Sequence, residues 1–267
     1  MFRIVREVNG MWYIEKGEYC GYVDPGYCMV DLADVLPRAQ FEIANASASI
    51  FRSSGYALDG VTGYQLYSCG KVWHSKLQRE EYLVPIMYDA AKKFASAQFL
   101  AEQEGLTLKI YDAYRPKSVT YLIRDSLNRL CSSNSQVLAG VSYAANGSAW
   151  GQGWFLAQST SSHNFGTAID VTLVDMATGQ EMEMPSAMHE LSTVAVKYSS
   201  SGGGSYAASM NEMAIKLDLI MDQAGLSPIA SEWWHFQDND ALARARDFKP
   251  GGCNFQAGEK IDIAGIR

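Results

Sequence analysis

The chain has 267 residues, 48% of them hydrophobic and 12% aromatic, which is enough for one large domain or one domain with a small appendage. Lys and Arg number 22 against 29 Asp and Glu, giving a net charge of −7 and a pI near 5.1. This balance disfavours nucleic-acid binding, because a phosphate backbone needs a basic face. No run of about 18 apolar residues occurs, so we expect no membrane span.

The first 30 residues differ from the rest of the chain. Short apolar and aromatic runs are broken by Asn9-Gly10 and Lys16-Gly17, a pattern that predicts small β-hairpins. The segment is similar to the closing strands of a bacterial SH3-like wall-binding repeat, although such a repeat needs about twice this length. Residues 1–30 are therefore either a truncated remnant of that module or an ordinary hairpin packed on the main domain, which we place at 37–267.

Hydrophobic periodicity and turn residues predict the elements of the main domain. In chain order these are a helix over 83–104 with Pro85 in its first turn and Gly105 after it, a strand over 107–114, a helix from Pro116 to about Leu130, a long loop over 132–160, a strand over 168–174, a flexible connector over 199–205 and a helix over 206–225. Strands and helices do not alternate strictly, which indicates an α+β fold.

Cysteine usage leaves the compartment open. The five cysteines form no CxxC pair, which argues against a structural zinc site built on thiolates. Cys20 and Cys28 are close enough in sequence to form a disulfide in a secreted protein. The first residues lack the apolar stretch of a signal peptide.

A histidine and an aspartate seven positions apart stand out in Ser161–Leu173, SSHNFGTAIDVTL. A turn at 164–166 would let His163 approach from a loop while Asp170 projects from the following strand. Alternation along that strand places Ala168, Asp170 and Thr172 on one face and the apolar residues between them on the other. The pair can be two ligands of one metal, or a satisfied histidine beside a solvated aspartate.

Glu232-Trp233-Trp234-His235 favours the metal interpretation. Glu232 and His235 share a face only on a helical turn or across a bulge, and the tryptophans indicate an aromatic wall. His235 would be the third ligand, and three protein ligands leave a fourth position for water, as in catalytic zinc sites. The alternative is a Trp-rich core strand with an ion-paired glutamate.

A third stretch, Tyr111-Asp112-Ala113-Tyr114-Arg115-Pro116, lies at a predicted strand-to-helix junction. An arginine held beside a helix N-terminus creates an electropositive spot that suits a carboxylate or a developing oxyanion. The alternative for Arg115 is an ordinary surface ion pair.

Together the three stretches resemble the zinc D-alanyl-D-alanine dipeptidases, within the wider group of zinc D,D-peptidases. Residues 161–170 match S-x-H-x-x-G-x-A-x-D at every fixed position, residues 232–235 match E-W-W-H, and residues 112–116 are similar to D-G-Y-R-P. The resemblance covers roughly residues 40–240 of the chain.

The resemblance implies a fold, a metal and residue roles. The fold would be a small antiparallel sheet that carries Zn²⁺, flanked by helices. Zn²⁺ would be bound by His163, Asp170 and His235. Glu232 would be the general base and Arg115 would stabilise the oxyanion, while Ser161 would contact the substrate.

Two positions depart from the family pattern. The dipeptidases hold the substrate amine with an aspartate, where this chain has His189 followed by Glu190. A tyrosine expected near residues 43–51 is also absent from that segment. The metal chemistry is therefore better supported than the preference for a free dipeptide.

The leading functional prediction is zinc-dependent hydrolysis of the D-Ala-D-Ala bond. One alternative is a D,D- or L,D-carboxypeptidase that trims peptidoglycan stem peptides. An alternative of another class is a catalytically silent zinc-containing binding protein. The expected partner is a small D-amino-acid peptide or a stem peptide, and the expected location is the cell envelope or the exterior, with the cytoplasm as alternative.

Overall fold

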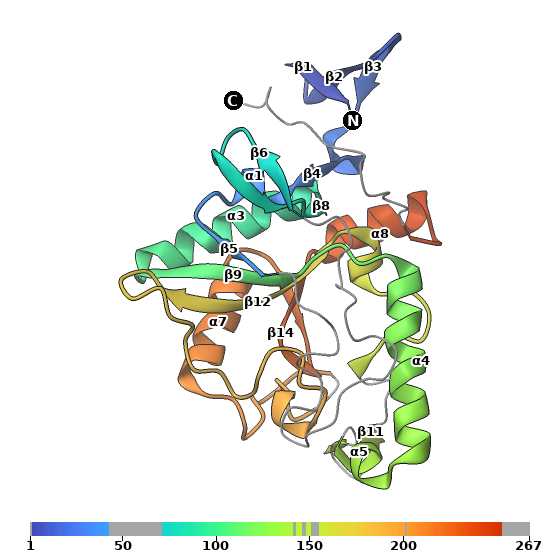
Figure 1. Cartoon of the computed structure of the whole chain (residues 1–267), viewed down its shortest axis with the longest axis vertical. Helices are drawn as coiled ribbons and strands as arrows, with labels where there is room; N and C mark the ends of the chain where they lie inside the picture. Colours follow the sequence, from blue (N-terminus) through green and yellow to red (C-terminus); the bar gives the residue numbers. More distant parts are fainter. Residues whose placement is uncertain are drawn as a thin grey trace.

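The computed structural model describes residues 2–42, 71–140, 143–145, 148–150, 155–200 and 202–252. Figure 1 shows an α+β arrangement in which long strands cross the middle of the molecule and helices surround them, which confirms the predicted class. Among the helices in the described part of the chain, none is both long and apolar enough to cross a bilayer.

The elements follow in chain order. The strands are β1 (Arg3–Val8), β2 (Met11–Lys16), β3 (Tyr19–Val23), β4 (Met29–Asp31), β5 (Gln40–Phe41), β6 (Lys71–His74), β7 (Arg79–Tyr82), β8 (Pro85–Met87), β9 (Leu106–Asp112), β10 (Tyr143–Ala145), β11 (Ser148–Trp150), β12 (Ala168–Asp175), β13 (Ser227–Ile229) and β14 (Glu232–Gln237). The α-helices are α1 (Leu32–Val35), α3 (Tyr88–Gln103), α4 (Lys117–Ser133), α5 (Ser135–Gly140), α7 (Glu212–Gln223) and α8 (Asn239–Phe248). Three 3-10 turns are η1 (Pro25–Tyr27), η3 (Ser162–Phe165) and η4 (Thr193–Ala195).

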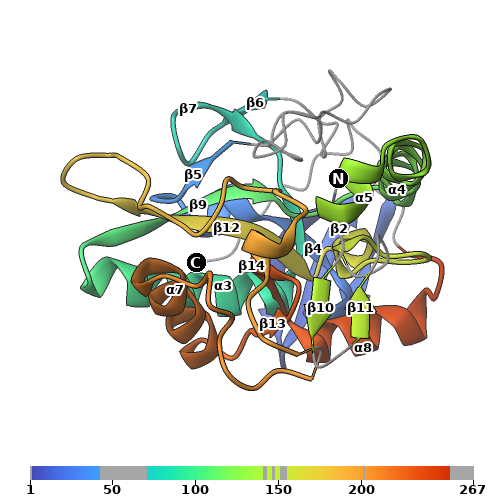
Figure 2. The same ribbon diagram turned by 90° about the horizontal axis from the view of Figure 1, so that it is seen from below.

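A five-stranded sheet in the order β13-β14-β12-β9-β5 forms the centre of the fold. Its pairings are antiparallel except for the parallel pair of β5 and β9. Helices α3 and α7 run side by side along one face of this sheet (Figure 2). The central strand β12 is paired on both edges, so side chains on it are held firmly in place.

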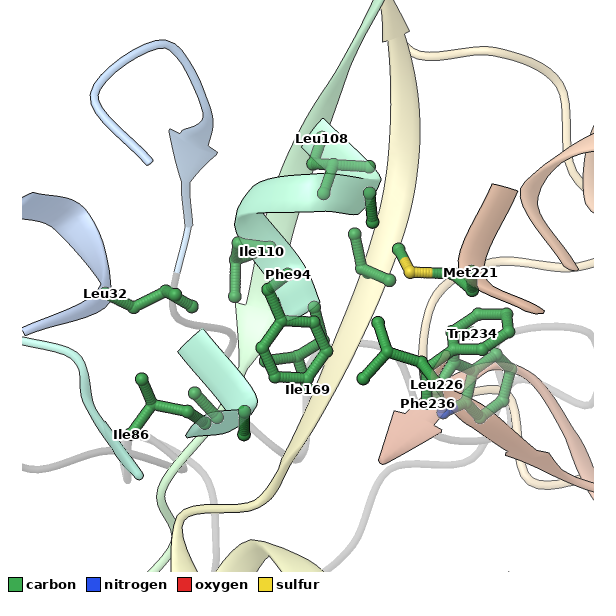
Figure 3. Packing of buried hydrophobic residues seen from close by; sticks show 14 of the residues in the cluster. Leu32, Ile86, Phe94, Leu108, Ile110, Ile169, Met221, Leu226, Trp234 and Phe236 are labelled. Carbon is green, nitrogen blue, oxygen red and sulfur yellow. The ribbon is translucent and has the colours of Figure 1, made fainter. Parts of the chain in front are cut away.

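The core lies between this sheet and the two helices (Figure 3). Ile169 on β12, Phe94 on α3 and Met221 on α7 are all fully buried. Val171 and Leu173 join Ile169 in the same cluster, as the alternating pattern predicts. The opposite face of β12 is therefore free to carry polar groups toward the site described below.

Two predicted helices begin later than expected. Pro85 lies in β8, which pairs with β4, so α3 starts only at Tyr88. The apolar residues of β8 continue the helical periodicity of α3, and this is why the sequence predicted an earlier start. The last long helix starts at Glu212 rather than at 206, because the Asn211 side chain caps it by accepting from the backbone N–H of Ala214.

The predicted loop over 132–160 is partly ordered structure, so that prediction was wrong in part. Asn134 Oδ1 accepts from the backbone N–H of Val137 at 3.3 Å and starts α5. Strands β10 and β11 pair antiparallel, and the sequence between them is Asn-Gly, a dipeptide typical of turns.

The N-terminal segment folds as a three-stranded antiparallel sheet, β1-β2-β3, at the top of Figure 1. The buried Trp12 on β2 meets Tyr88 edge to face, with ring centroids 4.6 Å apart. This contact attaches the sheet to the main body at the start of α3. Cys20 and Cys28 are free thiols here, and the relation to a wall-binding repeat stays a prediction.

Candidate metal centre and active site

Asp170 is the third residue of the central strand β12. In the register of the sheet its neighbours are His235 on β14 and Asp112 on β9. Three chemistry-bearing residues, each from a different predicted motif, thus lie in one row across three adjacent strands. The side chain of Asp170 is almost fully buried, so its charge must be compensated by its neighbours.

The turn before β12 delivers His163. Ser161 and Asn164 form a capping box at the start of η3, and Gly166 ends this turn in the left-handed conformation with a φ of 64°. An added Cβ on Gly166 would meet only the movable end of the Met29 side chain at 2.5 Å, so it is the left-handed φ that makes another residue costly here. The predicted delivery of His163 from a turn and Asp170 from a strand is confirmed.

A bulge in β14 brings Glu232 and His235 to the same site. Pro228 pairs with Phe236 and Ile229 pairs with Glu232, so residues 233–235 have no register partner on β13. As a result the consecutive residues Trp234 and His235 both line one cavity, which a regular strand would not allow. Trp234 forms the expected aromatic wall, whereas Trp233 is buried and donates from Nε1 to Ser186 Oγ at 2.9 Å.

Three ligand atoms from these residues form a compact triangle. His163 Nε2 lies 3.3 Å from Asp170 Oδ1, His235 Nδ1 lies 3.2 Å from the same oxygen, and the two nitrogens are 3.1 Å apart. Tetrahedral ligands at the usual zinc distances are separated by about 3.3 Å. The sides of the triangle therefore match a shared zinc ion.

The remaining nitrogen of each imidazole has a partner that orients the ring. His163 Nδ1 donates to the carbonyl oxygen of Ala113 at 2.7 Å. His235 Nε2 lies 3.1 Å from Gln237 Oε1 and 3.3 Å from Ser162 Oγ. Because these nitrogens donate outward, the lone pairs of both rings face Asp170 and the ligand triangle.

The second oxygen of Asp170 is also engaged. His189 Nε2 donates to Asp170 Oδ2 at 3.0 Å, and the guanidinium of Arg115 lies 3.9 Å from the same oxygen. Burial opposes the charge, but His163 and the other histidines hold the pKa of Asp170 well below its usual range. The carboxylate is therefore ionised, with Oδ1 left for a metal.

Arg115 is held by the buried carboxylate of Asp112. Arg115 Nε and a terminal nitrogen lie 2.9 and 2.8 Å from Asp112 Oδ2, and Asp112 is fully buried. Burial lowers the pKa of Arg115, but the carboxylates of Asp112, Asp170 and Glu232 raise it above its ordinary value. The guanidinium therefore stays charged while it lines the cavity.

The segment that carries Arg115 is tied to the turn that carries His163. The backbone N–H of Arg115 donates to the carbonyl of His163 at 3.1 Å. Asn164 Nδ2 donates to the carbonyl of Arg115 at 2.7 Å and to Thr120 Oγ1 at 2.9 Å. Because of these bonds, the arginine and the metal-ligand turn are fixed relative to each other.

Glu232 is buried beside the triangle. Its Oε2 lies 3.9 Å from His235 Nδ1. Burial raises the pKa of Glu232 to about 8 against the opposing charges of His235 and Arg115. A carboxyl group with such a pKa can both take up and release a proton near neutral pH.

The site opens into a cavity of about 260 Å³, at the small end of ligand-binding pockets. Its lining includes all six predicted site residues, Arg115, Ser161, His163, Asp170, Glu232 and His235. Apolar side chains of Ile123, Phe155, Leu156 and Leu191 complete the walls. The cavity therefore combines a charged floor with apolar walls suited to a small molecule.

Ser161 lies beside this cavity as expected, whereas His189 contacts Asp170. Ser161 lines it, and its hydroxyl also accepts from the backbone N–H of His163 at 3.3 Å. His189 lines the cavity, but its Nε2 is hydrogen-bonded to Asp170, and its backbone is left-handed with a φ of 60°. Glu190 is buried and is not among the lining residues. Residues 43–51, among which the sequence has no tyrosine, lie outside the described residues.

Sequence reasoning missed several supporting residues. Gln237 could have been found, because it lies two positions after His235 on the same strand face. Asp112 was seen as part of a motif but not as the partner of Arg115. The carbonyl of Ala113 leaves no side-chain signal.

The residues fit a catalytic metal. Two imidazoles and one carboxylate converge, both ring orientations are fixed by outer partners, and a glutamate and an arginine flank the cluster. This donor set suits zinc. The fold and site together define a hydrolase of the metallopeptidase class.

Comparison with known proteins supports the metallopeptidase class. The M15 peptidase family model, described as D-ala-D-ala dipeptidase, matches residues 57–250, so the chain belongs to this family. A D-alanyl-D-alanine dipeptidase of Escherichia coli K12 is 28% identical over 209 residues, covering 78% of this chain and 83% of that protein. The Enterococcus faecium D-alanyl-D-alanine dipeptidase is 28% identical over 152 residues, covering 56% and 70%.

A solved structure described as VanYB in complex with D-Alanine-D-Alanine was also matched. Its TM-score is 0.37 at 15% identity, covering 70% of this chain and 86% of that one.

Proposed function

We propose that this metallopeptidase is a zinc enzyme that hydrolyses the D-Ala-D-Ala peptide bond. The observation that carries the proposal is the triangle of His163 Nε2, Asp170 Oδ1 and His235 Nδ1 beside Glu232 in a small cavity. Membership of the family and the names of the two relatives support the same substrate.

The three ligand side chains would hold the zinc ion. When bound there, zinc would polarise the scissile carbonyl and lower the pKa of a water molecule to about 7. The protein restricts this chemistry to one position, because Ala113 and Gln237 fix the two imidazole rings.

Glu232 would act as the general base. Its carboxylate takes a proton from the attacking water and then gives it to the nitrogen of the leaving D-alanine, which departs as a neutral amine. Burial supports both transfers, because it raises the pKa of Glu232 to about 8.

Arg115 would stabilise the negative charge that develops on the substrate carbonyl oxygen. It lines the cavity, and Asp112 and the turn of His163 keep it from moving. A preorganised cation in a buried site stabilises an oxyanion more than it would in water. Ser161, which lines the same cavity, would hold the substrate by its hydroxyl.

A second candidate, a carboxypeptidase acting on peptidoglycan stem peptides, is favoured by one specific observation. Among the described residues that line the cavity, the carboxylates are Asp170 and Glu232, and both are assigned to metal and proton chemistry. A free substrate amine would need another anionic partner, whereas the acylated nitrogen of a stem peptide would not. This activity would place the protein in the cell envelope.

The test compares two substrates with protein of measured zinc content. Free D-Ala-D-Ala is one, and an N-acylated tripeptide that ends in D-Ala-D-Ala is the other. Cleavage confined to the dipeptide supports the leading proposal. Cleavage of the blocked peptide supports the carboxypeptidase, and cleavage of neither, with zinc bound, supports the catalytically silent zinc protein.

A further inference from the structure

A second group of metal-ligating side chains lies in the N-terminal half of the chain. Asp31 is the last residue of β4 and the N-cap of α1, Asp34 lies within α1, and His74 ends β6. One ligand atom from each lies within 4.8 Å of the other two. None of the three lines the active-site cavity.

His74 carries an unsatisfied polar atom. The residue is 5% exposed, and its Nε2 is buried without a hydrogen-bond partner among the described residues. Asp31 Oδ2 lies 3.6 Å from this nitrogen, too far for a hydrogen bond. A buried nitrogen without a hydrogen-bond partner destabilises the fold unless another group, such as a metal ion, binds it.

Asp31 presents one free oxygen to the same space. Its Oδ1 accepts from the backbone N–H of Ala33 at 3.1 Å and of Val84 at 3.0 Å. Its Oδ2 faces His74. Because Asp31 is 2% exposed, Oδ2 is shielded from water, and a cation bound to it would stabilise the ionised carboxylate.

The two carboxylates approach different nitrogens of the His74 ring. Nε2 lies 3.6 Å from Asp31 Oδ2, and Nδ1 lies 3.5 Å from Asp34 Oδ1. One ion can bind only one of these nitrogens, so the unpartnered Nε2 and Asp31 Oδ2 form the ligand pair, and Asp34 is the further carboxylate within reach. The separation of this pair is close to that of ligands around a tetrahedral zinc ion, about 3.3 Å.

We infer that Asp31, Asp34 and His74 form a second zinc-type divalent-cation site, with a structural role. Two carboxylates neutralise a dication, and an imidazole favours zinc over magnesium or calcium. The ion would tie α1 to the hairpin of β6 and β7, which lie close together above the central sheet in Figure 1. The hairpin would thereby be held against the main body.

The competing explanation is a protonated His74 that lies between two carboxylates without a metal. Zinc stoichiometry separates the two explanations. We would measure bound zinc in the full-length protein after exhaustive dialysis, for the wild type, His163→Ala, His74→Gln and Asp34→Asn. Asp34 has a side chain that is 14% exposed, so Asp34→Asn should fold even if His74→Gln does not.

The expected contents are two zinc ions for the wild type and one for each single variant. Asp34→Asn should still hydrolyse substrate, and His163→Ala should keep its remaining zinc. Asp89→Asn, which removes a carboxylate that contacts Lys92 and Arg244, is the matched control and should retain two. A wild type that binds one zinc ion, lost completely in His163→Ala, would overturn the second site without affecting the catalytic one.

Discussion

His163 Nε2 and His235 Nδ1 lie 3.1 Å apart. The other nitrogen of His163 donates to the carbonyl of Ala113, and that of His235 donates to Gln237 Oε1. Two lone pairs therefore point into one space, and they repel unless a cation lies between them. The outer hydrogen bonds thus orient both rings for metal binding.

Gln237→Leu should weaken zinc binding by about 10- to 100-fold, because it removes the acceptor that fixes the His235 ring. Gln237 is only partly buried, so the fold should survive the change. Competition with a chromogenic chelator measures the affinity. Gln237→Glu keeps an acceptor and should bind zinc nearly as well as the wild type. Equal weakening in both variants would show that Gln237 does not orient the ring.

Glu232→Gln should keep the zinc ion and lose turnover by about 10²- to 10⁴-fold, because the amide cannot accept a proton from water. Steady-state hydrolysis together with metal analysis measures both effects. Glu212→Gln, an exposed change in the first turn of α7, removes the same charge away from the active site and should leave turnover unchanged. A Glu232→Gln protein with normal turnover would exclude Glu232 as the base.

Arg115→Met should damage both stability and catalysis. Removing the guanidinium leaves Asp112 buried without its cation, which costs about 3–5 kcal/mol of unfolding free energy. The double variant Asp112→Asn, Arg115→Met should recover much of that stability. It should nevertheless keep a kcat about 10²- to 10³-fold below the wild type, because the oxyanion has lost its cation. Recovered turnover in the double variant would reduce Arg115 to a structural role.

The motifs predicted the ligand set, and they only partly predicted the backbone geometry that assembles it. His163 and Asp170 were predictable because the turn at Gly166 and the alternation along β12 are local features. The spacing of Glu232 and His235 allowed either a helical turn or a bulge, and the pairing of β14 with β13 determines that it is a bulge. The contact of His189 with Asp170 depends in the same way on a left-handed residue placed by tertiary structure.

The helix boundaries failed for a related reason. Residues 83–87 are apolar enough to extend the periodicity of α3, but pairing of β8 with β4 outweighs it. Likewise Tyr206 belongs to a bridge with Tyr198 rather than to α7. Local propensity is a weak signal where a tertiary partner competes.

Lys197 should make stability depend on pH. It is fully buried, with Nζ 2.9 Å from Asp218 Oδ1 and 3.7 Å from the centre of the Phe236 ring. Burial lowers the pKa of Lys197 to about 8 despite the neighbouring carboxylate of Asp218. Between pH 8 and about 10 the unfolded chain therefore binds more protons here than the folded one, and unfolding free energy rises with pH.

The measurement is urea unfolding at several pH values from 7.5 to 10. Relative to Lys197→Met, the wild type should gain up to about 1.4 kcal/mol per pH unit within this window. The variant will be less stable at every pH, since Asp218 loses its partner. The diagnostic quantity is therefore the slope of unfolding free energy against pH, and not the difference in stability between the two proteins. Parallel slopes for the two proteins would show that Lys197 has an ordinary pKa in the fold.

The most direct test of the account is the release of D-alanine from free D-Ala-D-Ala during titration of metal-free protein with zinc. We predict no hydrolysis without metal and two D-alanines released from each dipeptide cleaved. Activity should rise with occupancy of the site formed by His163, Asp170 and His235, and should be abolished in His163→Ala. Folded protein with this site fully loaded that leaves D-Ala-D-Ala intact would contradict it.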